Sequence, residues 1–236
     1  MRGRIAVVVP AYNEAPTLAD VVKAVKETLP DCLLIIVNDG SSDDTLRVAS
    51  ALSANYSNIV VLSHLFNLGS GAAFQTGVAY AFIKGYDYFV RIDGDGQHNP
   101  YEVHKLLNLV ISGKFDIVVG SRYLTKTGYT TSFTRKFGIA FTAKLASMLT
   151  HQKLTDVNSG YKVFNRRVAN LIVKFYLPRH PAFDFILRLH KAGFRLAEVP
   201  VEMRTRKHGK SEFSYTRLIL YPVRILQALI RYAISY

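Results

Sequence analysis

Short runs of apolar, mostly β-branched residues alternate with amphipathic stretches along the first half of the chain. Apolar runs bounded by Pro, Gly, Asn or Asp indicate buried strands, and apolar residues spaced by three and four indicate helices. The predicted strands are residues 5–9, 33–37, 59–62, 88–92 and 115–119. The predicted helices are residues 17–29, 43–52, 72–83 and 100–111. Strands that are apolar throughout and alternate with helices predict an α/β fold, with a parallel sheet covered on both faces.

This alternation stops after Ser121, and the second half of the chain follows a different pattern. Its predicted elements are helices over 131–150 and 182–191, a strand over 196–203, a basic loop over 204–210 and an amphipathic tail over 218–234. No window holds eighteen uninterrupted apolar residues, so we expect no spanning helix. The first apolar run ends at Pro10, which is too early for the hydrophobic region of a signal peptide.

Composition indicates one large globular domain with a strongly basic surface. The chain has 236 residues, of which 49% are hydrophobic, and 30 Lys and Arg against 17 Asp and Glu give a formal charge of +13. Such a surplus predicts an anionic partner, which can be nucleic acid, anionic lipid or a phosphorylated substrate. The single cysteine, Cys32, excludes an intrachain disulfide and a Cys-rich metal site. Because Leu33 and Leu34 follow it, we expect a buried thiol.

Polar side chains follow the first and second predicted strands. The first strand ends in Pro10, Ala11, Tyr12, Asn13 and Glu14, and the second is followed by the Asn-Asp-Gly-Ser-Ser-Asp run 38–43. Ligands of open parallel sheets bind at the carboxyl ends of the strands, so these residues are candidates for holding a nucleotide. Asp39 would accept from the base, and Tyr12 would offer its ring face or hydroxyl. Turn and helix-capping chemistry explains the same residues equally well at this stage.

The fourth strand is followed by Asp93-Gly94-Asp95-Gly96-Gln97-His98. Two carboxylates and an amide form the all-oxygen set that Mg²⁺ or Mn²⁺ prefers, and a diphosphate can share the ion. An EF-hand loop is excluded because position twelve, counted from Asp93, is His104 and not Glu. A solvated turn remains the alternative. The Gly-x-Gly of residues 69–71 lacks the third glycine of a dinucleotide fingerprint and follows the third strand.

These motifs, in this order, resemble glycosyltransferase family 2, whose members have the nucleotide-sugar-binding GT-A fold. Three later segments, residues 120–123, 155–162 and 206–211, look like the dolichyl-phosphate mannose synthases and related polyprenyl-phosphate transferases. Two features depart from the family pattern. Asn38 stands where an aspartate is usual, and Leu68 and Ser70 stand at positions that are often basic.

The resemblance implies a GT-A (Rossmann-like), mostly parallel sheet and assigns roles to individual residues. The implied nucleotide-binding residues are Pro10, Tyr12, Asn13, Glu14, Asp39 and Asp93. The implied ligands of a Mn²⁺ or Mg²⁺ cofactor are Asp93, Asp95 and Gln97. The residues that would meet donor or acceptor phosphates are Arg122, Arg135, Arg206 and Lys210. The residues implied in catalysis are Asp95, Arg122, Arg206, Lys210 and Asp156, the last as a candidate base whose alternative is loop capping.

The implied reaction is inverting transfer of mannose from GDP-mannose to dolichyl or polyprenyl phosphate. UDP-glucose or another sugar nucleotide as donor is the alternative. A nucleic-acid-binding protein would explain the charge, but it leaves Asp93 and Asp95 unexplained. A nucleotide-binding membrane scaffold without turnover is the third possibility.

We divide the chain into a catalytic domain, residues 1–211, and amphipathic C-terminal helices, residues 212–236. Arg217, Arg224 and Arg231 fall seven apart beside a broad apolar face. That pattern predicts helices lying in a membrane interface, with the protein peripheral on the cytoplasmic face. The alternative is a terminal helix packed on the domain's own core or on a second subunit.

Overall fold

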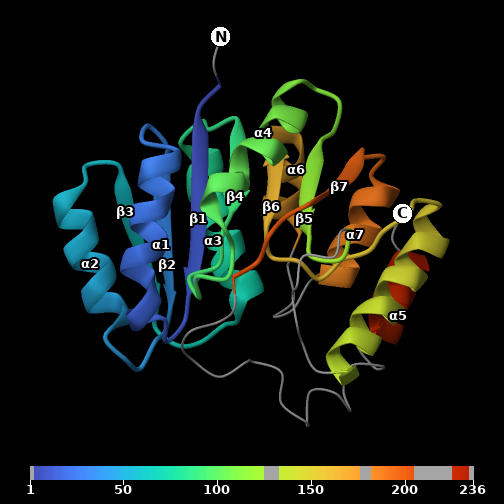
Figure 1. The fold of residues 1–236 in the computed structure, drawn as a ribbon, viewed down its shortest axis with the longest axis horizontal. Helices are drawn as coiled ribbons and strands as arrows, with labels where there is room; N and C mark the ends of the chain where they lie inside the picture. The colour runs from blue at the N-terminus through green and yellow to red at the C-terminus, as the bar shows by residue number, and fades with distance from the viewer. Residues whose placement is uncertain (1–2, 125–132, 176–181, 205–224, 234–236) are drawn as a thin grey trace.

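The computed structural model describes residues 3–124, 133–175, 182–204 and 225–233. Its central feature is a seven-stranded sheet in the order β3-β2-β1-β4-β6-β5-β7 (Figure 1). The strands are β1 (Ile5–Ala11), β2 (Leu33–Asp39), β3 (Ile59–His64), β4 (Tyr88–Arg91), β5 (Ile117–Ser121), β6 (Lys162–Asn165) and β7 (Leu196–Pro200). All neighbouring pairs are parallel except those that β6 makes with β4 and β5. The predicted α/β fold with a mostly parallel sheet is confirmed.

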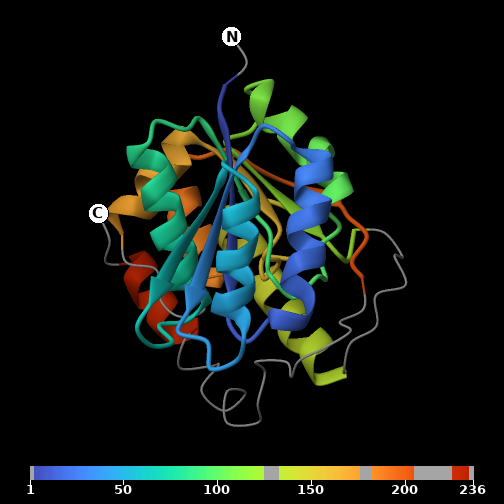
Figure 2. The ribbon, with the colours of Figure 1, turned by 90° about the vertical axis from the view of Figure 1, so that its left-hand side faces the viewer.

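Helices cover both faces of the sheet, with α1 and α4 on one face and α3 on the other (Figure 2). The helices are α1 (Ala15–Thr28), α2 (Thr45–Asn55), α3 (Ser70–Ile83), α4 (Val103–Ile111), α5 (Phe133–Thr150), α6 (Arg166–Lys174) and α7 (Ala182–Lys191). A short 3-10 turn, η1 (Pro100–Glu102), precedes α4. Alternate residues of β1 and β2 point to opposite faces, so one apolar cluster gathers α1 and α4 and the other gathers α3, α6 and α7.

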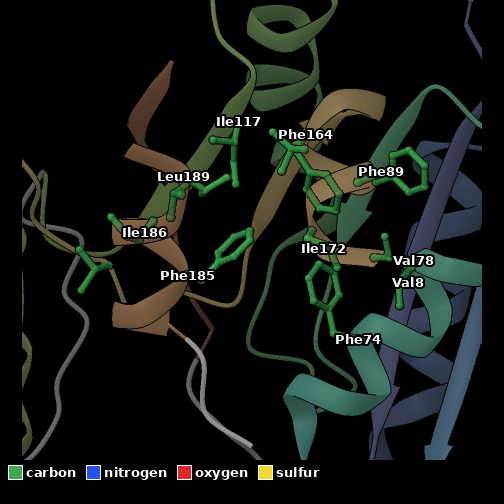
Figure 3. Packing of buried hydrophobic residues seen from close by; sticks show 14 of the residues in the cluster. Val8, Phe74, Val78, Phe89, Ile117, Phe164, Ile172, Phe185, Ile186 and Leu189 are labelled. Atoms are coloured by element: carbon green, nitrogen blue, oxygen red, sulfur yellow. The ribbon is translucent and has the colours of Figure 1, made fainter. Parts of the chain in front are cut away.

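Aromatic rings fill the second of these clusters (Figure 3). Phe89 of β4 stacks on Phe164 of β6 with ring centroids 5.4 Å apart, and Phe74 of α3 meets Phe164 edge-on at 5.8 Å. Phe185 and Ile186 of α7 extend the cluster toward β5. The cluster therefore binds β6 and the helices of the second half to the N-terminal half of the sheet.

The sequence pattern did not predict β6 or α6. The strand contributes four residues and begins with the charged Lys162, which is 4% exposed. Its antiparallel register pairs Val163 with Val90 of β4 and with Val118 of β5. β6 therefore joins the two strands whose ends carry the Asp93 and Arg122 motifs.

The side of α5 that carries Phe141 and Met148 is largely exposed, at 50% and 63% respectively. The buried side is formed by smaller residues, including Ala143 and Ala146. Ile139 is also buried, and Leu145 and Leu149 pack against the core cluster, so apolar side chains lie on both the buried and the exposed sides of α5.

Residues 225–233 form a helix that packs on the domain. Ile225 and Ala228 belong to the same buried cluster as α7. Arg231 Nε lies 3.1 Å from Asp184 Oδ1, which ties this helix to α7. The tail thus makes the contact with the core that we considered as an alternative, and Arg217 and Arg224 lie outside the described residues. No helix among the residues described is both long and apolar enough to cross a bilayer.

Candidate active site

The loops after β2, β1 and β4 meet because these strands are neighbours in the sheet. The Glu14 N–H donates to Thr45 Oγ1 at 2.8 Å, and so links the loop after β1 to the start of α2. The Gly94 N–H donates to the carbonyl of Pro10 at 3.2 Å, and so links the same loop to the turn after β4. The three predicted motifs therefore form one continuous surface at the carboxyl edge of the sheet.

Asn13 joins the loops after β1 and β2, where the sequence predicts that a nucleotide binds. Its backbone has a φ of 55°, in the left-handed region that Asn tolerates better than most residues. Its Oδ1 accepts from the Ser42 N–H at 2.9 Å, and its own N–H donates to Ser41 Oγ at 3.0 Å. Tyr12, beside it, is 38% exposed and available to a ligand.

Asp39 also has a structural part in this region. It is 2% exposed, and its carboxylate accepts from the backbone N–H groups of Leu68 and Gly69 at 3.0 and 2.7 Å. His64 Nδ1 lies 2.8 Å from the same carboxylate and Nε2 lies 3.0 Å from Thr76 Oγ1. Asp39 therefore holds the loop before α3 in place, and its contact with a base stays a prediction.

The turn after β4 presents two carboxylates in different environments. Asp95 is 9% exposed, and its Oδ1 accepts from the Gln97 N–H at 3.0 Å. Asp93 accepts from Arg91 Nε at 2.9 Å, and its side chain is 31% exposed. Burial would raise the pKa of Asp93, but the positive charge of Arg91 and its hydrogen bond to the carboxylate, together with Lys162, outweigh burial and lower the pKa to about 2. Asp93 is therefore ionised at neutral pH, as a metal ligand must be.

The donor set of this turn fits a hard divalent cation. Asp93, Asp95 and Gln97 offer two carboxylates and an amide oxygen on one short turn. The described part of the chain holds no cluster of three or more His, Cys, Asp or Glu side chains suited to a metal. A cation here would complete its shell with oxygens from a diphosphate or water, which is how Mg²⁺ and Mn²⁺ are commonly bound.

The buried side chains of His98 and Tyr161 hold the turn after β4 in place. Neither residue was assigned a role from the sequence. His98 Nδ1 accepts from the Asp93 N–H at 3.0 Å, and its ring stacks on Tyr161 with centroids 5.0 Å apart. The Tyr161 hydroxyl donates to the carbonyl of Asn99 at 3.0 Å. Burial lowers the pKa of His98, which favours the neutral ring that this hydrogen bond requires. The sequence contains one sign of this role for His98, which is that His98 directly follows the predicted metal ligand Gln97.

Arg122 and Asp156 form a buried, two-pronged ion pair at the end of β5. Arg122 Nε donates to Asp156 Oδ2 at 2.6 Å and a terminal nitrogen donates to Oδ1 at 2.7 Å. Asp156 is 0% exposed and Arg122 is 7% exposed. Both oxygens of the Asp156 carboxylate thus accept hydrogen bonds from the Arg122 guanidinium. The geometry therefore favours a positioning role for Asp156 over the base role expected from the sequence.

Lys162 of β6 is buried and interacts electrostatically with both the Asp93 carboxylate and the Arg122–Asp156 pair. Its ammonium donates to the carbonyl of Ser159. Burial and the nearby Arg91 lower the pKa of Lys162 to about 7, although Asp93 and Asp156 act in the opposite direction. Lys162 thus connects electrostatically the Asp93 carboxylate of the turn after β4 (residues 93–98, named the metal turn for its predicted ligands) and the Asp156 carboxylate of the Arg122 pair.

Other predicted residues lie outside the described side chains. Arg135 is in α5, where only its backbone is described, and Arg206 and Lys210 lie in the range 205–224. The chain leading to that range is described, and the Arg204 N–H donates to the carbonyl of Gln97 at 2.8 Å. Arg204, the last described residue before that range, therefore lies beside the metal turn.

A mostly parallel sheet with polar loops at the carboxyl ends of β1 and β2 and paired carboxylates after β4 is typical of nucleotide-binding α/β proteins. The model of Glycosyl transferase family 2 matches residues 6–172, and the chain belongs to this family. This confirms the family resemblance read from the motifs.

Relatives within the family are similar over most of their length. The polyprenol monophosphomannose synthase of Mycolicibacterium smegmatis is 31% identical over 219 residues, which cover 89% of this chain and 81% of that protein. The undecaprenyl-phosphate mannosyltransferase of Micrococcus luteus is 27% identical, covering 89% and 88%. The UDP-N-acetylglucosamine–dolichyl-phosphate N-acetylglucosaminyltransferase of Methanococcus voltae is 29% identical, covering 84% of each.

The fold matches a solved glycosyltransferase structure. Glucosyl-3-phosphoglycerate synthase from Mycobacterium tuberculosis, crystallised with Mn²⁺, UDP and glucosyl-3-phosphoglycerate, superposes with a TM-score of 0.71 at 20% identity. The match covers 98% of this chain and 80% of that one. The expected GT-A fold is confirmed.

Proposed function

We propose that this protein transfers mannose from GDP-mannose to a polyprenyl or dolichyl phosphate, with inversion at the anomeric carbon and with Mn²⁺ or Mg²⁺ bound. The observation that carries the proposal is that two charged sites follow β4 and β5, the two strands that flank β6 in the sheet. The carboxylates of Asp93 and Asp95 follow β4, and the buried cation Arg122 follows β5, with Lys162 of β6 between them. The mannosyltransferases among the relatives support the choice of sugar and acceptor.

The chemistry divides between the two sites. A divalent ion held by Asp93, Asp95 and Gln97 would neutralise the charge that develops on the departing diphosphate. Tyr12, Glu14 and their neighbours after β1 would orient the nucleoside. The lipid phosphate oxygen attacks the anomeric carbon as the bond to the diphosphate breaks.

Arg122 is suited to bring two anions together. The acceptor phosphate is already ionised at neutral pH, so a strong general base is not required. The reaction instead needs cations that lower the repulsion between donor and acceptor. We assign this role to Arg122, with Arg135, Arg206 and Lys210 as further phosphate contacts. Asp156 would keep the Arg122 guanidinium oriented.

UDP-linked sugars are the second candidate donors. The relative from Methanococcus voltae is named for UDP-N-acetylglucosamine as donor and dolichyl phosphate as acceptor. Asn38, near the end of β2 in the predicted nucleotide-binding region, departs from the family pattern. Its Nδ2 donates to Ser63 Oγ at 2.9 Å. A panel of GDP- and UDP-sugars tested with a polyprenyl phosphate separates the two donors.

The central test is release of nucleoside diphosphate that depends on polyprenyl phosphate and on Mn²⁺. We expect Asp95→Asn to lower this release about 100-fold, a loss similar to that of other groups that stabilise developing charge. Asp20→Asn is the matched control, because Asp20 is exposed on α1. Unchanged release by Asp95→Asn in the presence of metal would remove the metal turn from the mechanism. Equally fast release of nucleoside diphosphate without any lipid phosphate would contradict the proposal that a polyprenyl phosphate is the acceptor.

The loop residues have a separate test. We expect Arg206→Ala and Lys210→Ala to reduce turnover while sugar-nucleotide binding persists, because both are assigned to phosphate contacts. Calorimetric titration with the donor and steady-state rates with the acceptor measure the two properties. Full activity in both variants would exclude this loop.

We also propose that the protein associates peripherally with the membrane that holds the lipid acceptor. Leu226 and Ile230 on the terminal helix are 57% and 47% exposed, and the net charge of +13 favours anionic lipid. The cytoplasmic face stays a prediction.

A further inference from the structure

Glu198 of β7 reaches across the end of the sheet to the loop that carries Asp156. Its Oε2 accepts from the Thr155 N–H at 2.7 Å and from Thr155 Oγ1 at 2.6 Å. Its Oε1 accepts from the Asp156 N–H at 2.9 Å. One carboxylate thus fixes two consecutive residues of the loop, from a strand 42 residues further along the chain.

This loop is attached to Arg122 on two sides. Asp156 holds the guanidinium through two hydrogen bonds and also accepts from the Arg122 N–H at 3.1 Å. Thr155 Oγ1 lies 2.7 Å from Ser121 Oγ, which accepts from the Tyr123 N–H at 3.2 Å. The residues before and after Arg122 therefore connect to Glu198 through Thr155, and its side chain connects through Asp156.

We propose that Glu198 is a positioning residue that sets the orientation of Arg122 through Thr155 and Asp156, and so tunes binding of the acceptor phosphate. This inference rests on the proposed function, which gives Arg122 its phosphate. Glu198 itself is not placed against substrate. Its carboxylate acts by holding the loop in the one arrangement that serves Arg122 from both sides.

The geometry predicts what a change at Glu198 does. Glu198 uses both oxygens as acceptors toward three donors, and an amide offers a single oxygen. Glu198→Gln leaves at least one N–H of the loop facing an NH₂ group, so Thr155 and Asp156 lose their shared anchor. The volume is almost unchanged, and Arg122 and Asp156 are both retained.

The experiment compares Glu198→Gln with Glu202→Gln, which removes the same charge from an exposed side chain four residues away. Each is made in the native background and in Arg122→Ala. Thermal unfolding reports folding, titration with the donor reports nucleotide binding, and steady-state rates with a polyprenyl phosphate give kcat and KM for the acceptor.

We expect Glu198→Gln to lower kcat/KM for the acceptor about 10- to 100-fold, as for loss of a charged hydrogen bond, with donor binding unchanged. In the Arg122→Ala background the same substitution should change kcat/KM less than about twofold, because residues that act through one group are not additive. Glu202→Gln should match the native protein in both backgrounds.

Two results overturn the inference. One is a loss from Glu198→Gln that is equally large in the Arg122→Ala background, which would mean a general structural role. The other is native acceptor kinetics in a folded Glu198→Gln. A different result, native activity of Arg122→Ala alone, would instead contradict the role of Arg122 in the proposed function.

Thr155 provides a second route if Glu198→Gln does not fold. Thr155→Val removes the hydroxyl that joins Glu198 to Ser121 and keeps the shape, whereas Thr155→Ser keeps the hydroxyl. We expect the acceptor KM to rise in Thr155→Val and to stay native in Thr155→Ser. Equal kinetics in these two variants would overturn the inference.

Discussion

Gly160 packs so closely against the turn after β4 that no room is left for a side chain. A Cβ built on Gly160 would lie 2.2 Å from Asp93 Oδ2 and 3.0 Å from His98 Cε1. Gly160→Ala must therefore displace the carboxylate of the metal turn. Because displacement of a positioning group by about 1 Å can cost about 100-fold in rate, we expect a loss of that order in the proposed transfer, measured as release of nucleoside diphosphate.

Gly138 provides the matched control for this substitution. A Cβ at Gly138, within α5, meets no heavy atom of the described residues within 4 Å. Gly138→Ala should keep native transfer and stabilise the helix slightly, because Ala favours a helix over Gly by about 1 kcal/mol. If Gly160→Ala releases nucleoside diphosphate as fast as Gly138→Ala, the packing of Gly160 against Asp93 has no part in the reaction.

Cys32 should be inert in the folded protein. Its side chain is 3% exposed, and burial raises the pKa of the thiol to about 11. At pH 8 only about one thiol in a thousand would then be ionised, and the thiolate is the reactive form. We expect native protein to resist iodoacetamide at pH 8 and to react in 6 M guanidinium. Rapid labelling of folded protein would show that β2 opens at its start.

At the scale of single residues, the sequence predicted which motifs gather but not how they support one another. Asn13 and Asp39 were expected to touch a nucleotide, and the structure uses their side chains to hold loops about 30 residues away. Glu198 had no signal at all, because its partners Thr155 and Asp156 are distant in sequence and are brought to it by β5 pairing with β7. Such roles follow from tertiary contacts, which local patterns do not contain.

At the scale of elements, strands were predicted well where they are apolar throughout and parallel. β6 was missed because Lys162–Asn165 is short and places a lysine at a buried position. Composition argues against burying a lysine, and only its neighbours Asp93 and Asp156 make that burial tolerable. α6 was missed with it, because its nine residues follow β6 directly.

Asn165 makes the junction between β6 and α6 testable. Its Oδ1 accepts from the Val168 N–H at 3.1 Å as the N-cap of α6, and its Nδ2 donates to Asp116 Oδ1 at 2.9 Å. We expect Asn165→Ala to lower the free energy of unfolding by about 2 kcal/mol, from the lost cap and the lost partner of a buried carboxylate. Urea titration measures this.

Asn108→Ala is the control for that substitution, because Asn108 is an exposed residue in the interior of α4. Exposed helical positions away from such contacts usually change stability by less than about 0.5 kcal/mol. Equal midpoints for the two variants would mean that the cap and the Asp116 contact contribute nothing measurable.

For the whole molecule, the two faces of the sheet differ in what covers them. The helix of residues 225–233 lies over the face that carries α3, α6 and α7 (Figure 2). It buries Ile225 and Ala228 against that face and leaves Leu226 and Ile230 exposed. The amphipathic pattern read from the sequence therefore describes a helix with two apolar sides, one occupied by the domain and the other available to a lipid surface.

The two sides of this helix can be separated by mutation. Replacing Leu226 and Ile230 with Gln should weaken co-sedimentation with anionic liposomes, since burying each side chain in the interface contributes about 1.5–3 kcal/mol. The free energy of unfolding should change by less than about 0.5 kcal/mol, because both residues are exposed. Ile225→Gln should do the reverse, because Ile225 is 9% exposed within the core cluster.

Leu46 and Ile111 supply the control for this last prediction. They are 41% and 48% exposed on α2 and α4, which cover the opposite face of the sheet. Replacing both with Gln makes the same change in side-chain chemistry at positions of comparable exposure and should leave liposome binding unchanged. Equal losses in the two double variants would mean that binding follows overall hydrophobicity, and unchanged binding in both would place the membrane contact elsewhere. Only a loss confined to Leu226 and Ile230 assigns the interface to the terminal helix.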